Sequence, residues 1–390
     1  MRVGVIGGGQ LAWMMGSAAD ALGLDLIVQT PSLRDPAVAI AAETIIAPVD
    51  DAVATAQLAQ CCDVITFENE FIDIPALTAL SDSAALFRPR LEALAPLLDK
   101  LEQHNYLRSL GLPVPQFIAL KPSTVLTPTG ITDPITGMAL IFPIVLKARR
   151  HGYDGKGTCI ARTLADLRRI ASPQAIAADL WMAEEFVPFE RELAVMAARG
   201  QDGAIALYPV VESIQVDQVC RRVVAGVDLP LAVTQAAEVI TQTLLQSLNV
   251  IGIFGVELFL TADDRLLINE IAPRTHNSGH YSLDACITSQ FEQQLRAVCG
   301  LPLGDPSLQW PALMVNLLGY EDAEEDYLPQ RQKLAQIPQA AVYWYGKGQS
   351  RPGRKLGHVT VILDSHQAIA EQANAISRHI ESIWYCGKTS

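Results

Sequence analysis

Short apolar runs alternate with longer amphipathic stretches at the start of the chain. Residues 2–6, 25–29, 44–47 and 64–67 are apolar runs that predict buried strands, and residues 10–22 predict a helix after the first of them. Such an alternation indicates a parallel sheet, because parallel neighbours need a crossover connection between them. We therefore expect an α/β fold that begins with a Rossmann-like parallel-sheet domain over residues 1–98.

A different pattern follows this first domain. Residues 99–110 predict a helix that Gly111 and Pro113 end, and the Pro-, Thr- and Gly-rich residues 122–137 predict a long surface loop. Further strands are predicted over residues 142–147, 158–161, 180–184, 192–197, 204–211, 255–260, 342–344 and 359–362, and helices over residues 231–248 and 366–380. We divide these elements between a central domain, residues 99–302, and a small C-terminal α+β domain, residues 303–390.

Length, charge and cysteine content exclude several classes of protein. The 390 residues exceed one compact core, and with 50% hydrophobic and only 18% charged residues they are typical of a well-buried enzyme. The formal net charge of −13 argues against a nucleic-acid partner, which selects a broad basic face. No apolar stretch has the length of a membrane span, and glycines interrupt the N-terminal run that mimics a secretory signal. The seven cysteines contain no Cys-x-x-Cys pair and suit a reducing cytoplasm.

Two glutamates flank a predicted hairpin in the central domain. If Asp263 and Asp264 form a two-residue turn, Glu257 and Glu270 lie directly opposite each other in antiparallel strands, where like charges repel. A bridging Mg²⁺ would turn this repulsion into coordination and would bring phosphates with it. An acidic edge strand explains one glutamate better than it explains the pair. Because Asp-Asp is not a preferred turn dipeptide, a register shifted by one residue stays open.

Anion ligands follow the second of these glutamates directly. An arginine, an asparagine and two histidines stand at Arg274, Asn277, His276 and His280. A carboxylate at a strand end can hold a divalent cation, and the cationic and polar groups behind it can hold an oxyanion. Few structural roles need this order of residues, so residues 269–280 are interpreted as part of a catalytic centre.

Two glycine-rich turns are candidates for phosphate binding. Residues 4–12 contain Gly-x-Gly-x-x-Ala between a strand and a helix, but Gln29, Thr30 and Pro31 stand where a dinucleotide fold needs a ribose-binding acid. A phosphate of something other than NAD is therefore favoured over a turn without a ligand. Residues 147–158 join two strands by a loop with three glycines and cationic flanks, without the order of residues of a P-loop. A flexible hairpin tip is the weaker alternative.

Three shorter segments carry weaker signals. Residues 184–187, followed by Glu192, predict a strand that leads into an open segment able to bind an adenine edge and a ribose, although taken alone they are explained better by a solvated acidic turn. The basic turn at residues 351–358 indicates an anion such as a sugar phosphate, with a solvated basic loop as an equal alternative. Residues 66–70, Thr-Phe-Glu-Asn-Glu, end a predicted parallel strand, where such folds bind ligands.

Taken together, these segments resemble the ATP-grasp superfamily and, within it, the N5-carboxyaminoimidazole ribonucleotide synthetases of purine biosynthesis. The best-matching motifs are Asn-Glu-x-Ala-Pro-Arg-x-His-Asn-Ser-Gly-His at residues 269–280 and Arg-Pro-Gly-Arg-Lys-x-Gly-His at residues 351–358. The Gly-Tyr-Asp-Gly-x-Gly loop at residues 152–157, Gly-Gly-Gln-Leu at residues 8–11 and Thr-x-Glu-x-Glu at residues 66–70 also fit. The resemblance extends over nearly the whole chain. It implies a central ATP-grasp domain with a glycine-rich lid subdomain over about residues 123–187.

The resemblance also implies an ATP-dependent ligase. Such enzymes convert ATP, bicarbonate and 5-aminoimidazole ribonucleotide into N5-carboxyaminoimidazole ribonucleotide, ADP and phosphate through carboxyphosphate, and the resemblance suggests a homodimer in the cytoplasm. The implied catalytic residues are Arg274, His276 and Lys355, and the implied ligands of one or two Mg²⁺ ions are Glu257 and Glu270. The implied ATP ligands are Lys100, Lys147, Gly152, Tyr153, Asp154, Gly155, Lys156, Gly157, Thr158, Glu184, Glu185, Phe186, Val187, Glu192, Gln215, Asn269 and Glu270. The implied ribonucleotide ligands are Gly8, Gly9, Gln10, Leu11, Glu68, Tyr153, Asn277, Arg351, Arg354 and Lys355.

The chain departs from the family pattern at several positions. Lys100 and His104 stand where the family usually has an arginine and a lysine, His151 replaces a glycine of the lid, and Ala12-Trp13 replaces a usual Gly-Arg. Lys100 keeps the positive charge of the arginine without its bidentate fork. These changes leave the predicted metal ligands intact.

Other functions stay open at this point. Another ATP-grasp ligase with a different amine acceptor would share most of these motifs, but residues 351–358 favour the aminoimidazole enzyme. A non-catalytic nucleotide-binding homologue is disfavoured by the intact Glu257, Glu270, Arg274 and Lys147. A dehydrogenase is disfavoured by the missing ribose acid.

Overall fold

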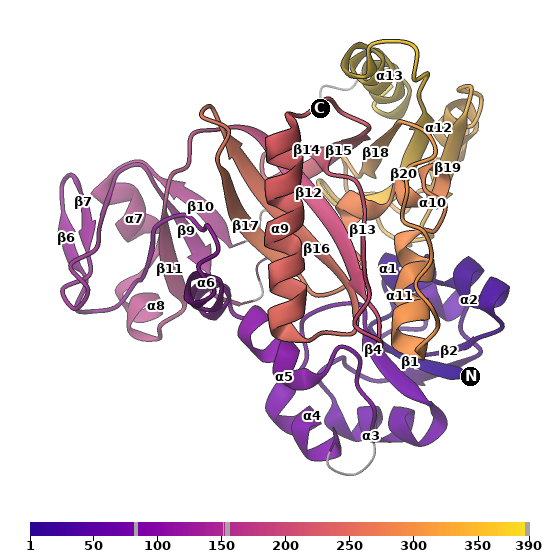
Figure 1. Cartoon of the computed structure of the whole chain (residues 1–390), viewed down its shortest axis with the longest axis horizontal. Helices are drawn as coiled ribbons and strands as arrows, with labels where there is room; N and C mark the ends of the chain where they lie inside the picture. The colour runs from indigo at the N-terminus through magenta and orange to yellow at the C-terminus, as the bar shows by residue number, and fades with distance from the viewer. Residues whose placement is uncertain (82–84, 151, 153–156, 387–390) are drawn as a thin grey trace.

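The computed structural model describes residues 1–81, 85–150, 152 and 157–386. In this described part of the chain the strands form four sheets. Figure 1 shows an N-terminal α/β unit at the bottom, a long central sheet behind helix α9, a smaller strand-rich unit at the left and the C-terminal elements at the top. The predicted Tyr153, Asp154, Gly155 and Lys156, together with His151, lie outside the described residues.

The N-terminal sheet is parallel, as predicted, with the order β3-β2-β1-β4. Its strands are β1 (Arg2–Ile6), β2 (Asp25–Thr30), β3 (Glu43–Ile46) and β4 (Val64–Phe67). The helix predicted over residues 10–22 is interrupted by the buried Met14 and Met15, so it forms α1 (Gln10–Trp13) and α2 (Gly16–Leu22). The remaining helices here are η1 (Pro36–Ala39), α3 (Ala52–Cys61), α4 (Ile74–Ser81), α5 (Leu91–Leu94) and η2 (Ala95–Leu97).

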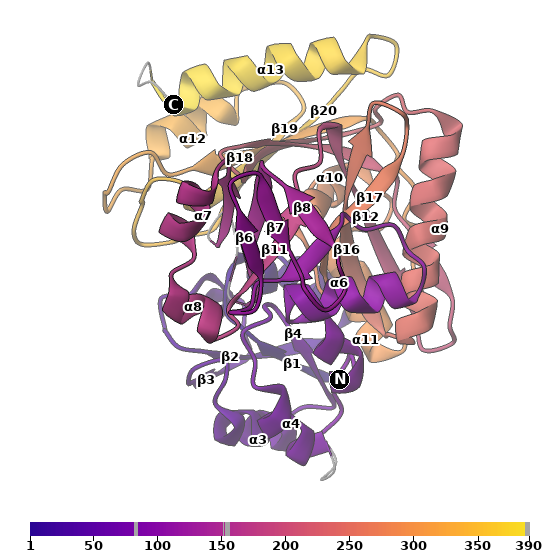
Figure 2. The same cartoon turned by 90° about the vertical axis from the view of Figure 1, so that its left-hand side faces the viewer.

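Helix α6 (Lys100–Ser109) then leads into the strand-rich unit that faces the viewer in Figure 2. The prediction of a long surface loop over residues 122–137 is wrong, because an antiparallel sheet in the order β6-β7-β8 begins there. Ile131 and Leu140 bury its inner face, and Gly130 lets the strands approach where a Cβ would lie 2.1 Å from the Leu140 carbonyl oxygen. The elements are β5 (Phe117–Ala119), β6 (Val125–Thr127), β7 (Gly130–Thr132), β8 (Ala139–Ile141), β9 (Ile144–Ala148), β10 (Thr158–Ala161), α7 (Leu164–Ile170), α8 (Pro173–Ala177) and β11 (Trp181–Glu185).

The central sheet has the order β17-β16-β12-β14-β15-β18-β20-β19, with β13 beside β12. Sequence reasoning missed β18 (Ala312–Leu318), whose residues are all buried. A strand covered on both faces is a continuous apolar run without the alternation that marks a half-buried strand. The other strands are β12 (Phe189–Arg199), β13 (Ile205–Leu207), β14 (Val211–Val216), β15 (Val219–Ala225), β16 (Gly252–Thr261), β17 (Leu266–Ala272), β19 (Ala340–Trp344) and β20 (Lys355–Ile362).

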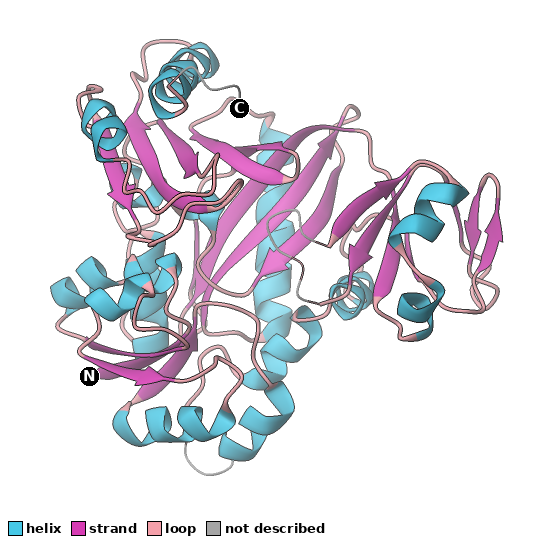
Figure 3. Ribbon diagram, turned by 180° about the vertical axis from the view of Figure 1, so that it is seen from behind, coloured by secondary structure: helices cyan, strands magenta, loops and turns pink. Residues whose placement is uncertain are grey.

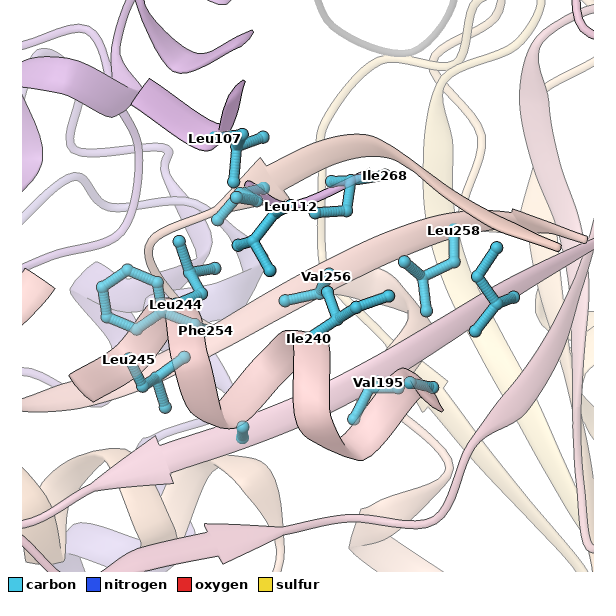
Figure 4. Close-up of a cluster of buried hydrophobic side chains, with 14 of the residues drawn as sticks. Leu107, Leu112, Val195, Ile240, Leu244, Leu245, Phe254, Val256, Leu258 and Ile268 are labelled. Carbon is cyan, nitrogen blue, oxygen red and sulfur yellow. The ribbon is translucent and has the colours of Figure 1, made fainter. Parts of the chain in front are cut away.

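Helix α9 (Leu231–Leu248), predicted with these bounds, covers one face of this sheet. Figure 4 shows Ile240, Leu244 and Leu245 of α9 packed against apolar side chains of β12 and β16, such as Val195 and Val256. Figure 3, seen from behind, places the strands in front of α9. The burial of this apolar stripe holds the long strands rigid, and the site is built along them, with Glu192 within β12 and Glu257 within β16.

Helix α11 (Gln290–Cys299) fastens the N-terminal sheet to the central sheet. The side chain of Gln294 accepts a hydrogen bond from the Ile253 backbone N–H of β16 at 2.7 Å and donates one to the Thr66 hydroxyl of β4 at 2.7 Å. The two sheets therefore present their strand ends to the same space. The remaining helices are η3 (Asn277–Gly279), α10 (Ser282–Ala285), α12 (Leu328–Leu334) and α13 (Ile369–Trp384).

Candidate active site

A cleft of about 970 Å³ lies between the units of the structure. Most of the described residues that the sequence singled out line this cleft. They are Gln10, Leu11, Glu68, Lys100, Lys147, Gly152, Thr158, Glu184, Glu185, Phe186, Val187, Glu192, Gln215, Glu257, Asn269, Glu270, Arg274, His276, Asn277, Arg351, Arg354 and Lys355. Of the described candidates, Gly8, Gly9 and Gly157 do not belong to the lining.

Glu257 and Glu270 face each other across β16 and β17, as predicted, but the turn differs from the prediction. The prediction of a two-residue turn is wrong. The Thr261 N–H donates a hydrogen bond to the Arg265 carbonyl oxygen at 3.0 Å, so the turn contains three residues, and one of them, Asp264, has a φ of 57°. This longer turn shifts the pairing by one residue, and a bulge at Asn269 shifts it back. The bulge therefore restores the predicted pairing of the glutamates.

The environment of this pair is suited to a cation. Burial and the neighbouring Glu270 raise the pKa of Glu257 to about 7, and burial together with Glu257 raises the pKa of Glu192 to about 7. Burial opposes ionisation of Glu270 as well, but an ion pair with Lys100 outweighs it and lowers the pKa of Glu270. Within the described residues no group of three or more His, Cys, Asp or Glu side chains is arranged to hold a metal. A Mg²⁺ ion that also binds phosphates needs only one or two protein carboxylates, so the pair fits it.

Lys147, at the end of β9, is held from three directions. Its Nζ lies 2.8 Å from Glu184 Oε2 and donates to the Asn269 side-chain oxygen at 3.0 Å and to the Asn269 carbonyl oxygen at 3.4 Å. The second oxygen of Glu184 lies 2.9 Å from His104 Nε2. Burial would raise the pKa of Glu184, but Lys147 and His104 lower it to about 2. The ammonium is therefore fixed beside Asn269, the neighbour of Glu270 in β17.

Arg274 and His276 follow β17 and line the cleft together with the two facing glutamates. The Arg274 guanidinium makes a two-point ion pair with Glu70, with Nε–Oε1 at 2.9 Å and Nη2–Oε2 at 3.1 Å. His276 Nε2 lies 3.6 Å from Glu257 Oε1. Gly255 leaves room for this imidazole, since a Cβ there would lie 2.8 Å from the Cβ of His276.

The glycine turn after β1 packs against a carboxylate. A Cβ at Gly9 would lie 2.2 Å from Glu68 Oε1, and this oxygen accepts a hydrogen bond from the Leu11 N–H at 3.4 Å. Burial raises the pKa of Glu68. Likewise, a Cβ at Gly8 would lie 2.4 Å from the Thr30 hydroxyl oxygen. The glycines thus let the end of β4 approach the start of α1. Glu68 accepts a hydrogen bond from the Leu11 N–H, which belongs to the turn that the sequence predicted to bind a phosphate.

Sequence reasoning missed one cation of the cleft, Lys347. Its Nζ donates to the Gln10 side-chain oxygen at 2.7 Å and to the Lys355 carbonyl oxygen at 2.8 Å, which joins the C-terminal basic turn to α1. The only signal in the sequence is its position between two glycines shortly before residues 351–358. Arg351, Arg354 and Lys355 line the same cleft.

Asn277 and the segment after β11 complete the lining. The Asn277 and Asn316 side chains exchange two hydrogen bonds, at 2.9 and 2.7 Å, so the Asn277 amide has one orientation. Glu184 points into the ion pairs with Lys147, whereas Glu185 Oε1 accepts a hydrogen bond from the Gln116 N–H at 2.9 Å. Glu184 is thus a support of Lys147 in this structure, and Phe186 is 39% exposed.

Family models match three consecutive parts of the chain. The ribonucleotide synthetase preATP-grasp domain matches residues 1–96, the ATP-grasp domain residues 105–291, and the phosphoribosylaminoimidazole carboxylase C-terminal domain residues 312–372. The predicted ATP-grasp fold with an N-terminal parallel-sheet domain is confirmed by these matches.

Curated relatives match over nearly the full chain. The N5-carboxyaminoimidazole ribonucleotide synthase of Synechococcus elongatus is 56% identical over 98% of this chain and 95% of its own length. The enzyme of the same name from Synechocystis is 50% identical over 98% of both chains.

Solved structures of carboxyaminoimidazole ribonucleotide synthases have the same fold as this chain. Carboxyaminoimidazole ribonucleotide synthase from Aspergillus clavatus, complexed with ATP, superposes with a TM-score of 0.86 and 31% identity over 98% of this chain and 97% of that chain. A second structure from that organism, in complex with ADP and 5-aminoimidazole ribonucleotide, has a TM-score of 0.85 and 29% identity over 98% of both chains. From this likeness in sequence and fold, the chain belongs to the N5-carboxyaminoimidazole ribonucleotide synthase family of ATP-grasp ligases.

Proposed function

We propose that the cleft joins bicarbonate to the amine of 5-aminoimidazole ribonucleotide at the expense of ATP, in purine biosynthesis. One observation carries this proposal: the facing pair Glu257 and Glu270 lines the same cleft as a buried lysine, Lys147, and the Arg274–His276 segment. Phosphoryl transfer needs positioned reactants and neutralised charge more than covalent help from the protein. The site offers both, along the rigid strands of the central sheet.

Lys147 and Lys100 bind the phosphates of ATP in this proposal. Gly152 and Thr158 of the glycine segment contribute to this phosphate site, residues 184–187 contact the adenine, Glu192 binds the ribose, and Gln215 lies beside it. The ATP and ADP complexes of the Aspergillus relatives support a nucleotide as a ligand.

Glu257 and Glu270 hold Mg²⁺ together with the phosphate oxygens of ATP. A bound Mg²⁺ neutralises the charge that develops on the transferred phosphoryl group. Lys100, which pairs with Glu270 in the structure, can then turn to the phosphates. The raised pKa of Glu257 supports this assignment, because burial and the neighbouring Glu270 disfavour its charged form, which a bound cation would stabilise.

Arg274 and His276 orient bicarbonate for attack on the γ-phosphate and then hold the carboxyphosphate. Both line the same cleft as Lys147, and an oxyanion bound beside them would meet the cationic guanidinium. The two-point contact with Glu70 fixes the plane of that guanidinium. Lys355 completes the proposed catalytic set.

The ribonucleotide occupies the end of the cleft near α1. Its phosphate is held by the cations of the basic turn, and its ring is positioned by Glu68, Asn277 and the turn at residues 8–11. The cations in this role are Lys347, Arg351, Arg354 and Lys355. The structure of the Aspergillus relative contains ADP and 5-aminoimidazole ribonucleotide, which supports the ribonucleotide as a ligand here.

The test is phosphate release from MgATP at controlled bicarbonate, with and without 5-aminoimidazole ribonucleotide. Release that requires bicarbonate and the ribonucleotide together is the expected result. Release that needs bicarbonate but ignores the ribonucleotide would point to a different amine acceptor. Binding of ATP without any release would contradict the proposed catalysis.

A cytoplasmic homodimer with three domains is the proposed form of the protein. All seven cysteines, each within the described residues, are free thiols, which supports a reducing compartment. Among the described helices none is long and apolar enough to cross a membrane. The matched family models support domains over residues 1–98, 99–302 and 303–390, and we place the lid subdomain over about residues 123–187. Strands β18 and β20 of the proposed C-terminal domain extend the central sheet, so these two domains share one sheet. Sedimentation equilibrium would reveal a mass of twice 42.2 kDa for a dimer.

A further inference from the structure

Asn316 is a buried polar residue in an apolar strand. It stands between Val315 and Leu317 in β18, whose other residues are all apolar, and it is 4% exposed. A leucine at this position would continue the pattern, whereas a buried amide costs free energy unless hydrogen bonds satisfy it. The hydrogen bonds of the Asn316 side chain therefore indicate its role.

The Asn316 amide connects β18 to β15 and to η3. Its Nδ2 donates to the Cys220 carbonyl oxygen of β15 at 2.9 Å and to Asn277 Oδ1 at 2.7 Å, and its Oδ1 accepts from Asn277 Nδ2 at 2.9 Å. Both hydrogens of the Asn316 amide are thus used, one on each partner. Of the two asparagines only Asn277, which is 7% exposed, lines the cleft.

The Cys220 carbonyl makes the orientation of both amides unique. Exchanging oxygen and nitrogen in the two side chains together would preserve the two hydrogen bonds between them. It would, however, turn the Asn316 oxygen toward the Cys220 carbonyl oxygen, and two oxygens that can only accept would then face each other. The backbone of β15 therefore decides, through Asn316, which end of the Asn277 amide is the nitrogen.

One N–H of Asn277 remains after this pairing. When two amides exchange two hydrogen bonds, each nitrogen donates the hydrogen on the side of its own oxygen, and its second hydrogen points away from the pair. Within the described residues the Asn277 side chain makes no other hydrogen bond. Its second N–H is therefore available to a ligand, whereas the exchanged orientation would offer an oxygen in its place.

We propose that Asn316 is a positioning residue that turns an N–H of Asn277 toward the ribonucleotide, so that this part of the cleft selects a hydrogen-bond acceptor. The proposal rests on the proposed function, in which Asn277 contacts 5-aminoimidazole ribonucleotide. A site built to donate a hydrogen bond rejects a ligand that offers no acceptor, because its own polar group is then left unpaired. Asn316 acts on the ribonucleotide only through Asn277.

A double-mutant cycle tests whether Asn316 acts through Asn277. We expect Asn316→Ala and Asn277→Ala each to raise the KM for 5-aminoimidazole ribonucleotide about tenfold, while the KM for ATP stays within about twofold. The double variant should match Asn277→Ala alone, since a side chain that has been removed cannot be misoriented. Independent effects would instead multiply to about a hundredfold.

Asn374→Ala is the matched control for this cycle. It removes an exposed asparagine of α13 that accepts a hydrogen bond from Arg222 Nη2 at 2.8 Å, outside the cleft, and it should leave both KM values unchanged. Multiplied effects in the double variant would overturn the proposal. A wild-type KM for the ribonucleotide in Asn316→Ala would overturn it as well.

The donated hydrogen bond can be observed in the wild-type protein. In NMR spectra of protein labelled with nitrogen-15 asparagine, the Asn277 side-chain signal is assigned by its absence in Asn277→Ala. One of its two amide protons should shift when 5-aminoimidazole ribonucleotide is added in the presence of ADP. A signal that does not respond would refute the proposal, even where Asn316→Ala does not fold. A wild-type chain that shows this shift but releases no phosphate from MgATP would refute the proposed function and leave this inference standing.

Discussion

Arg274 and Glu70 form a two-point ion pair between the end of β17 and the loop that follows β4. Two nitrogens of the guanidinium meet two oxygens of the carboxylate, at 2.9 and 3.1 Å. This geometry fixes the plane of the guanidinium as well as its position. The central sheet thus depends on the N-terminal unit to orient a residue of its own catalytic segment.

Replacing Glu70 by Gln should therefore lower kcat while the fold is kept. A glutamine cannot present two oxygens to the fork of Arg274, so the guanidinium would lose its fixed plane. We expect kcat to fall about tenfold and the KM for ATP to change little, since the removed contact acts on orientation. Steady-state kinetics measure both constants. Glu43→Gln, which breaks an exposed pair with Arg2, is the control, and a wild-type kcat in Glu70→Gln would contradict the assignment.

The facing carboxylates predict how the enzyme responds to Mg²⁺. Removal of the metal with EDTA should abolish turnover, because the charge on the transferred phosphoryl group would be left uncompensated. Glu257→Gln should raise the Mg²⁺ concentration for half-maximal rate at least about tenfold, since it removes one of the proposed ligands. Titration of Mg²⁺ at saturating ATP measures this, with Glu292→Gln on α11 as a control for charge alone. An unchanged Mg²⁺ requirement would exclude Glu257 as a ligand.

Removing the catalytic side chains themselves should separate chemistry from folding. Glu270→Ala and Arg274→Ala should each abolish turnover, because they delete a metal ligand and the cation for carboxyphosphate. Circular dichroism and the thermal midpoint would show whether the fold is retained. Near-normal activity in either variant would disprove the site assignment.

Lys347 predicts a selective loss of ribonucleotide binding. Lys347→Met should raise the KM for 5-aminoimidazole ribonucleotide about tenfold, because it removes one cation from the proposed phosphate site and the contact with Gln10. The KM for ATP should stay within about twofold, since the proposed function places ATP at the other end of the cleft. Lys333→Met on the exposed face of α12 is the matched control. Equal increases in both constants would show that Lys347 acts on the fold instead.

The buried His358 makes stability depend on pH. Burial lowers its pKa from 6.5 to about 3, so between these values the unfolded chain binds a proton that the folded protein does not. The free energy of unfolding therefore falls as the pH is lowered through this window. From pH 7.5 to pH 5.0 we expect His358 to contribute a loss of about 2 kcal/mol. Urea unfolding at both pH values should show a smaller loss in His358→Gln, and an equal loss would disprove the prediction.

The local pattern of the chain was sufficient for the parallel sheet and for the helices predicted over residues 10–22, 99–110, 231–248 and 366–380, whereas other helices such as α3 and α11 were not predicted. The apolar runs of β1 and β4 and the amphipathic period of α9 are decided by which side chains must leave water, and this information is local. The pairing of Glu257 with Glu270 was predicted as well. In the structure, however, this pairing results from two features that the prediction did not include and whose effects on the register cancel. The bulge at Asn269 offsets the longer turn around Asp264, and neither has a signal strong enough to read from sequence.

Other features depend on residues that are distant in the chain. Strand β18 is recognisable only once sheet neighbours and helices cover both of its faces, and the sheet that begins at residue 125 depends on the burial of Ile131 and Leu140. Glu70 meets Arg274, and Lys347 meets Gln10, across more than two hundred residues each. Apolar patterning and motif spacing act locally and therefore determined the parallel sheet, the long helix α9 and the family of this chain. Long-range packing alone decided which charges meet, because the energy of an ion pair depends on distance in space.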